Sequence, residues 1–174
     1  FGNMQKVTLP IVNKACVVRQ MEQINRQCGI PNFFVASHYM AGDVISTIER
    51  AKLTTPSMRI YHIVREAMKN TGTAASEIVI RIYRDHFRDE DYVMIVTGDT
   101  SFPAADLNEF QSKFLQYAAS HPQILAGVGY VIRPVSELIR EFPTAVIDSD
   151  GVVKRIAEKP FTLLTAQELS EENS

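Results

Sequence analysis

Two spacings of apolar residues alternate along this chain, one typical of helices and the other of strands. In the first helical segment apolar residues recur about every three positions, with Lys14 one turn before them, and Gly29 follows as a stop. A later helix is expected to be capped by Asp43, and its inner stripe runs to Leu53. The helices expected on this basis span residues 15–27, 43–53, 72–87, 106–119 and 134–141.

Short, unbroken apolar runs predict strands that are buried on both faces. The run Asp91–Thr97 is the clearest of them, and we expect a central strand that ends at Gly98-Asp99. Near the end of the chain two such runs flank Asp148–Gly151, a loop that predicts an antiparallel hairpin. The strands expected on this basis span residues 32–36, 58–64, 91–97, 124–132, 144–147 and 152–157, and the β-branched run at 78–80 also suits a strand.

Alternating strands and helices followed by a hairpin predict one α/β domain over residues 1–174. Its sheet is expected to be mostly parallel and flanked by helices, with the hairpin as an antiparallel edge. Functional sites in such sheets lie at the carboxyl ends of the strands. This rule directs attention to Gly98-Asp99.

The composition excludes several classes of protein. The 174 residues are 45% hydrophobic and 22% charged, which is typical of a globular domain rather than a disordered chain. A net charge of −2 offers no basic surface for nucleic acid, and no apolar run is long enough to span a membrane. Cys16 and Cys28 lack metal-ligand neighbours, so we expect free thiols and a cytoplasmic protein.

Asp99 is the leading candidate for chemistry because it directly follows the expected central strand. A carboxylate at this edge of a sheet suits an oxygen ligand for Mg²⁺ that carries the phosphates of a nucleotide. On residue type alone, however, a structural role is favoured, because aspartates after strands often cap the following turn.

Other polar segments could also contact phosphate groups. Lys6 and Lys14 could neutralise phosphate charge, although a lysine is usually only a solvated surface residue. The turn Gly72-Thr73-Ala74 could present backbone N–H groups to a phosphate or a base, or it could simply start a helix. Glu158-Lys159-Pro160 would ordinarily be an exposed strand end. The four histidines have neither metal-site spacing nor a nucleophilic partner.

The order and spacing of these segments are more informative than any one of them. Leu9-Pro10-Ile11-Val12-Asn13-Lys14, followed by a helix, Cys28-Gly29-Ile30 and a strand, resembles the stretch after the catalytic loop of sugar-1-phosphate nucleotidyltransferases. These pyrophosphorylases make nucleotide sugars. Gly72-Thr73-Ala74, Val96-Thr97-Gly98-Asp99 and the late hairpin with Glu158-Lys159-Pro160 resemble further motifs of the family, in the same order. The resemblance covers most of the chain.

The resemblance implies a Rossmann-like sheet of the GT-A type, Mg²⁺ as the cofactor and, as in many members, a homo-oligomer. It also implies transfer of a nucleotidyl group from a nucleoside triphosphate to a sugar 1-phosphate, with release of pyrophosphate. Catalysis would rest on positioning and charge stabilisation, because the sugar phosphate is already ionised. The residues in matching positions are Lys6 on the triphosphate, Gly72 and Thr73 on the nucleotide, Asp99 on Mg²⁺ and the nucleotide, and Glu158 and Lys159 on the sugar and its phosphate.

The chain also departs from the family pattern. The family's glycine-rich loop does not precede Lys6, and Val7 and Ala15 stand where prolines are usual. Pro143 stands where many members have a glycine whose N–H contacts the sugar, and proline has no such donor. We expect a fragment of a longer enzyme that lacks the first strand, the glycine-rich loop and the C-terminal part. The competing explanation is a degenerate domain that has kept the fold and lost the chemistry.

Two functions therefore remain open. The first is the nucleotidyltransferase, and the second is a pyrophosphorylase-like regulatory domain that binds a nucleotide sugar or a partner subunit. An unrelated flavodoxin-like or receiver domain is disfavoured, because no acidic cluster or phosphate loop follows the first strand and the late hairpin does not suit it.

Overall fold

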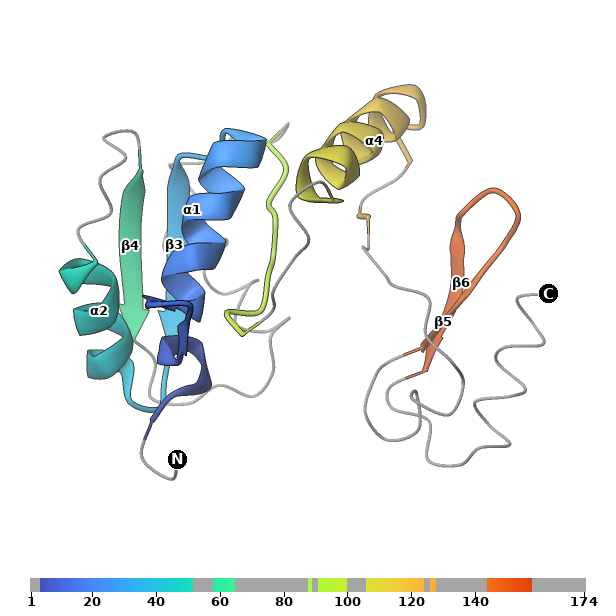
Figure 1. Cartoon of the computed structure of the whole chain (residues 1–174). Coiled ribbons are helices and arrows are strands. Elements are labelled where there is room, and N and C mark those ends of the chain that lie inside the picture. The colour runs from blue at the N-terminus through green and yellow to red at the C-terminus, as the bar shows by residue number, and fades with distance from the viewer. Residues whose placement is uncertain are drawn as a thin grey trace. The chain divides into compact units, whose positions relative to one another are not determined.

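The computed structural model describes residues 4–51, 58–64, 88, 91–99, 106–123, 126–127 and 144–157. The chain divides into two compact units, Phe1–Leu125 and Ala126–Ser174. The elements expected at residues 72–87, 124–132 and 134–141 lie outside the described residues. Within the described part the chain is a mixed α/β protein with small two-stranded sheets, one of them parallel (Figure 1).

A strand–helix–strand unit forms the centre of the first part. Strand β3 (Asn32–Ser37) pairs in parallel with β4 (Arg59–Val64), and helix α2 (Ala41–Arg50) lies between them in the sequence. Side chains alternate between the two faces of a strand. Phe33 and Val35 therefore face the helices, whereas Phe34 stacks on Tyr61 with ring centroids 5.0 Å apart on the other face. Both predicted strands are confirmed.

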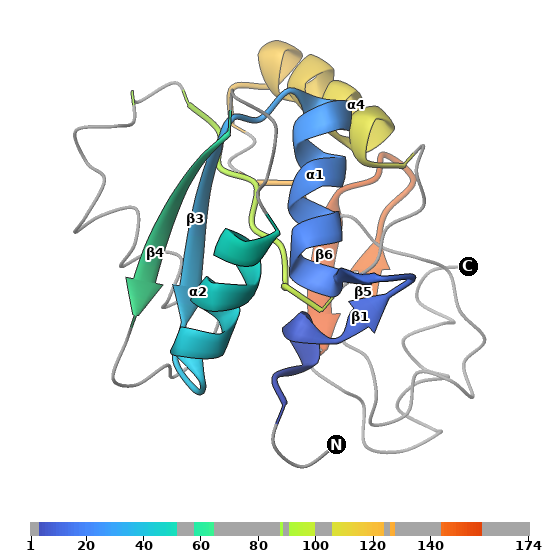
Figure 2. The ribbon, with the colours of Figure 1, turned by 60° about the vertical axis from the view of Figure 1, so that its left-hand side comes forward.

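Helix α1 (Cys16–Cys28) packs on the same face of the sheet as α2 (Figure 2). Its buried residues Val17, Val18 and Met21 form one apolar cluster with two residues of α2 and with the facing side chains of β3 and β4. The helix ends at Gly29, which takes a left-handed conformation with φ of 66° and donates its N–H to the Asn25 carbonyl group. This is the stop that the sequence predicts, because glycine adopts positive φ without a steric penalty.

Helix α2 begins earlier than expected. Its N-cap is Met40 in a left-handed conformation, so Asp43 lies within the first turn and does not cap the helix. A carboxylate in the first turn still stabilises a helix through its dipole. The helix ends at Arg50, and Leu53 lies outside the described residues.

A short hairpin precedes α1 and was not expected from the sequence. A 3₁₀ turn, η1 (Lys6–Thr8), leads into β1 (Pro10–Ile11), which pairs antiparallel with β2 (Lys14–Ala15). The two connecting residues, Val12 and Asn13, have φ of 49° and 65°, as a tight two-residue hairpin loop requires. The Arg19 side chain of α1 donates to the Ile11 carbonyl oxygen at 3.0 Å and so holds the tip of the hairpin.

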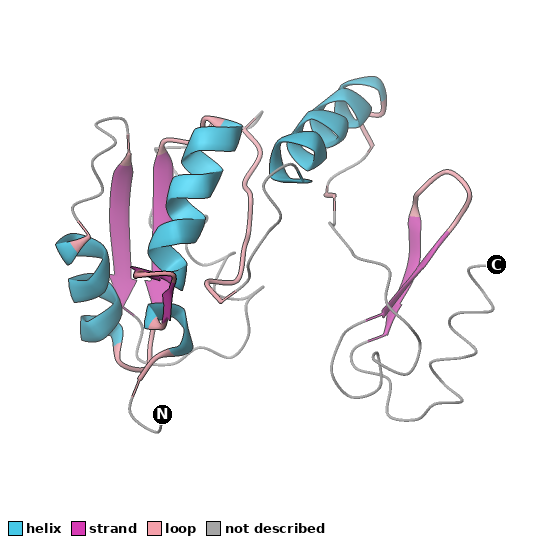
Figure 3. Ribbon diagram, viewed as in Figure 1, coloured by secondary structure: helices cyan, strands magenta, loops and turns pink. Residues whose placement is uncertain are grey.

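The expectation of a central strand at residues 91–97 is wrong. The structure assigns no strand to this segment, which Figure 3 draws as a loop. Tyr92 and Ile95 are 53% and 58% exposed, so the segment is not buried on both faces. The segment contacts two helices: the Tyr92 ring packs edge-on against Phe114 of the helix at 106–120, and the Thr97 carbonyl group accepts a hydrogen bond from α1.

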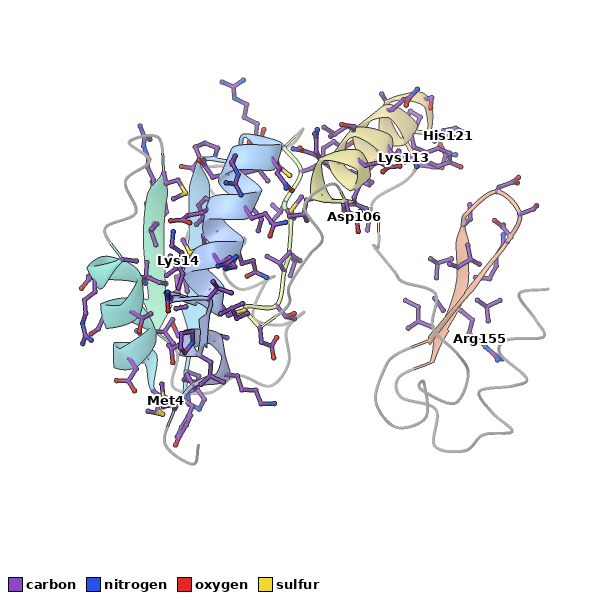
Figure 4. The ribbon with its side chains drawn as sticks, in the orientation of Figure 1. Met4, Lys14, Asp106, Lys113, His121 and Arg155 are labelled. Atoms are coloured by element: carbon purple, nitrogen blue, oxygen red, sulfur yellow. The ribbon has the colours of Figure 1, made fainter. Side chains whose placement is uncertain are left out.

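Helix α4 (Asp106–Ser120) confirms the helix expected over residues 106–119. It lies at the C-terminal end of α1, where the Gln111 side chain donates to the Cys28 carbonyl oxygen at 3.4 Å. Leu107 and Ala118 are buried, whereas Leu115 is 42% exposed. Lys113 and Glu109 form an ion pair on the surface of this helix (Figure 4).

The second unit contains the expected antiparallel hairpin, β5 (Thr144–Ile147) and β6 (Val153–Ala157). Asp148 organises its loop, because Oδ1 accepts hydrogen bonds from the N–H groups of Asp150 and Val152 at 3.0 and 2.8 Å. Gly151 supplies the positive φ, 80°, that the loop needs. Lys154 forms an ion pair with Asp148 at 2.8 Å. In the described part of the chain, none of the helices has the length and apolar character needed to cross a membrane.

Candidate functional site

The candidate site lies at the edge of the first unit where β3 and β4 end. Helix α2 starts four residues after β3 ends, so its N-terminus belongs to this edge. Helix α1 ends four residues before β3 begins, so it runs back along the strands and also starts here (Figures 1 and 2). Turn η1 packs against both helices, and the Gln5 side chain donates to the Tyr39 carbonyl oxygen just after β3.

The structure brings Lys6 and Asp99 to this edge from distant parts of the sequence. A β-carbon placed on Gly98 would lie only 3.0 Å from Cγ1 of Val7, so the Gly98 backbone lies closely against the Val7 side chain. Lys6 directly precedes Val7, and Asp99 directly follows Gly98. Both side chains are exposed to solvent. The contact between Val7 and Gly98 thus makes Lys6 and Asp99 sequence neighbours of one packing contact.

A side chain that sequence reasoning missed fixes the Gly98-Asp99 turn. Gln20 is 5% exposed on the inner face of α1, and its Nε2 donates to the Thr97 carbonyl oxygen at 2.8 Å. A polar residue among the apolar positions of an amphipathic helix is the signal that could have found it, because buried amides are hydrogen-bonded. Gln20 therefore positions the segment that carries Asp99.

The charge of Asp99 affects the pKa of the Cys16 thiol, which lies in the first turn of α1. Burial raises the pKa of this thiol, the negative charge of Asp99 raises it further, and the Arg19 guanidinium group lowers it. Burial also raises the pKa of the Cys28 thiol at the other end of the helix. Both cysteines are free, as expected, and their raised pKa values favour the unreactive thiol form.

Lys14 does not share the candidate site. It lies in β2 rather than on the helix, and its Nζ forms an ion pair with Glu22 of α1 at 2.7 Å (Figure 4). The Lys14 ammonium group donates hydrogen bonds to both carboxylate oxygens of Glu22, which partly neutralises its positive charge. It therefore attracts a phosphate less strongly than an unpaired lysine would. The structure thus separates the two lysines that the sequence left equivalent.

The remaining candidates lie outside the described residues. These are Gly72 and Thr73 on the nucleotide, and Glu158 and Lys159 on the sugar and its phosphate. Pro143 also lies outside them. Asp99 stands at a turn, and the residues that follow it, with which a cap would form, are not described either.

The donor set at Asp99 fits a hydrated Mg²⁺ ion held jointly with a phosphate. Mg²⁺ is commonly bound by one or two carboxylates, several waters and substrate phosphate oxygens. The described residues contain no group of three or more acidic, histidine or cysteine side chains that could hold a metal ion on their own. One exposed carboxylate suits the shared mode of binding.

No protein-family model matches the chain, and no curated protein or solved structure matches it either.

Proposed function

We propose that the chain is a nucleotidyltransferase domain with a Rossmann-like, GT-A type fold. It transfers a nucleotidyl group from a nucleoside triphosphate to a sugar 1-phosphate and releases pyrophosphate. The observation that carries the proposal is the close approach of Gly98 to Val7, which brings Asp99 and Lys6 to the carboxyl edge of a parallel strand pair. Ligands of open α/β sheets bind at this edge.

The roles of the two side chains follow from their charges. Lys6 would bind the triphosphate and reduce the repulsion between the two anionic reactants. Asp99 would hold Mg²⁺, which neutralises phosphate charge when bound. The hydrogen bond from Gln20 to Thr97 keeps the Gly98-Asp99 turn in place. No side chain needs to remove a proton, because the sugar phosphate is already ionised at neutral pH.

Gly72, Thr73, Glu158 and Lys159 complete the proposed site. The resemblance to sugar-1-phosphate nucleotidyltransferases implies that Gly72 and Thr73 contact the nucleotide. It also implies that Glu158 and Lys159 contact the sugar and its phosphate. Their roles depend on the sequence motifs alone, so substitution of each pair tests the resemblance separately from the Lys6 and Asp99 geometry.

Pyrophosphate release tests the proposal directly. The protein is incubated with Mg²⁺, glucose 1-phosphate and, in turn, ATP, UTP, GTP, CTP and dTTP. Asp99→Asn should lower the rate at least about a hundredfold, since removal of one charge-stabilising group typically costs that much. Asp91→Asn is the matched control: Asp91 is exposed in the same segment, and an amide oxygen can still accept its bond from the Arg88 N–H.

The regulatory alternative predicts a different result. If the chain only binds a nucleotide sugar, UDP-glucose or a related compound should raise the melting temperature while no triphosphate gives pyrophosphate. Equal rates for Asp99→Asn and the wild type would contradict the role proposed for Asp99.

A further inference from the structure

Two buried polar groups lie on the helix-facing side of the parallel strands. Ser37 is 7% exposed at the carboxyl end of β3, and His62 is half-buried in β4. The Ser37 hydroxyl oxygen and the His62 Nδ1 are both buried, and neither has a hydrogen-bond partner among the described residues. An unpaired buried polar group lowers stability, so each needs an explanation.

The register of the sheet places these two groups on the same face. His62 pairs with Val35, and Ser37 follows Val35 by two residues, so both share the face that carries Val35. Val35 packs against the cluster that contains Val44 and Ile48 of α2. The Ser37 and His62 side chains therefore project toward α2, and from strand geometry their Cα atoms lie about 8 Å apart.

Helix α2 begins at Ala41, four residues after Ser37, and has no side-chain cap. The helix has ten residues, and its N-cap, Met40, makes no side-chain hydrogen bond to the first turn. Gly42 in that turn is exposed, and a β-carbon placed there would meet nothing within 4 Å. Uncapped backbone N–H groups at the positive end of a helix bind anions.

The geometry points to a phosphate-binding subsite formed by Ser37, His62 and the first turn of α2. A phosphate oxygen accepts hydrogen bonds from the Ser37 hydroxyl, from Nδ1–H of His62 and from backbone N–H groups of the helix. Phosphate fits because all three groups donate hydrogen bonds and each of its oxygens accepts them. This subsite lies at the same edge of the parallel pair as the candidate site, but it uses neither Lys6 nor Asp99, and phosphate binding to it is tested without the proposed transfer reaction.

The negative charge of Asp43 lies near the proposed subsite and should repel a phosphate, so its removal should raise the phosphate affinity rather than lower it. Asp43 lies exposed in the first turn of α2. Its carboxylate repels a phosphate bound at the helix N-terminus. Asp43→Asn should therefore tighten phosphate binding, by about twofold for an exposed and screened charge.

Titration calorimetry with inorganic phosphate, at ionic strength held constant with sodium chloride, tests the subsite. Ser37→Ala should weaken binding about tenfold, the loss expected for one hydrogen bond to a charged ligand. Ser112→Ala on the exposed face of α4 is the matched control and should bind like the wild type. His62→Asn keeps a polar group near the position of Nδ1 and should retain more affinity than His62→Leu.

Thermal denaturation shows whether Ser37→Ala acts on the ligand or on the fold. Without phosphate this variant should be at least as stable as the wild type, because it removes an unpaired buried hydroxyl group. Phosphate should raise the melting temperature of the wild type and Ser112→Ala, but raise that of Ser37→Ala far less. Equal phosphate affinity of Ser37→Ala and the wild type, or no phosphate binding by either, would overturn the proposal.

The same titration with nucleoside monophosphates shows whether the subsite binds the phosphate of a nucleotide or a free phosphate ion. Tighter binding of AMP or UMP than of inorganic phosphate, with the same dependence on Ser37, assigns the subsite to a nucleotide. Equal affinities assign it to the free ion or to any phosphomonoester. Both results support the subsite. A nucleotide affinity that is the same in Ser37→Ala and in the wild type contradicts it.

Discussion

Gly98 is the residue on which the geometry of the candidate site depends most closely. A β-carbon at this position would lie 3.0 Å from Cγ1 of Val7, well inside ordinary van der Waals contact. Gly98→Ala should therefore push the turn away from η1 and destabilise the protein by about 1 kcal/mol, the lower end of the range for overpacking. Denaturant unfolding measures this loss, and nucleotide affinity should fall with it.

A second substitution separates the contact from other effects of alanine. Val7→Ala removes Cγ1, so Gly98→Ala should cost much less in the Val7→Ala background than in the wild type. An unchanged cost in both backgrounds would show that Val7 does not limit the space at Gly98. Gly42→Ala is a matched glycine control, because a β-carbon there meets nothing within 4 Å.

For individual residues, the sequence indicates which ones carry charge but not which ones contact each other in the folded protein. Asp99 can be found because it ends an apolar run, and Lys6 because of its place in a motif. Val7 and Gln20 cannot be assigned a site role from the motifs, because their role depends on contact with residues far along the chain. Only the folded structure distinguishes Lys6, exposed at η1, from Lys14, bound to Glu22.

Among the elements, the β5–β6 hairpin owes its loop to one ionised carboxyl group. A hydrogen bond from Lys154, together with backbone N–H donors of Val152 and Asp150, lowers the pKa of Asp148 below its ordinary value. A carboxyl group with a lowered pKa in the folded state stabilises that state above its unfolded pKa. This stabilisation is lost as the pH falls through the lowered, folded-state pKa.

NMR titration of the Asp148 carboxyl carbon measures this effect. Its pKa should lie below the ordinary value for aspartate, and Lys154→Met should raise it toward that value. Lys14→Met removes the same charge from the ion pair with Glu22 in the other unit and should leave the pKa of Asp148 unchanged. A pKa of Asp148 that does not respond to Lys154→Met would contradict the assigned cause.

Elements with strong local signals are predicted well, and those that depend on distant partners are not. Helix α1 ends at the expected glycine, and the β5–β6 loop has the expected glycine at positive φ. The strand expected at residues 91–97 is wrong: an apolar run becomes a strand only where another strand pairs with its backbone, and none of the described strands pairs with this segment. The β1–β2 hairpin was missed because Val12 is an unusual residue at positive φ.

For the whole molecule, the parallel pair defines the edge at which the proposed site lies. At its carboxyl edge lie the N-termini of α1 and α2, turn η1 and the Gly98-Asp99 turn. From the sequence, the rule that sites lie at this edge of an α/β sheet was applied to a strand at residues 91–97, which the structure does not have. Asp99 instead follows Gly98, which packs against Val7 of η1. The close approach of η1 could not be foreseen, since it rests on a single contact between distant segments.

Paramagnetic broadening by Mn²⁺ tests the central claim most directly, because Mn²⁺ replaces Mg²⁺ and broadens the NMR signals of nearby nuclei. With a nucleoside triphosphate present, broadening should be strongest for Val7 and Cys16 and decline along α1 to Cys28, about 18 Å away. It should disappear in Asp99→Asn and persist in Asp91→Asn. Broadening that is strongest near Cys28, or that survives Asp99→Asn, would contradict a metal–nucleotide site at Asp99.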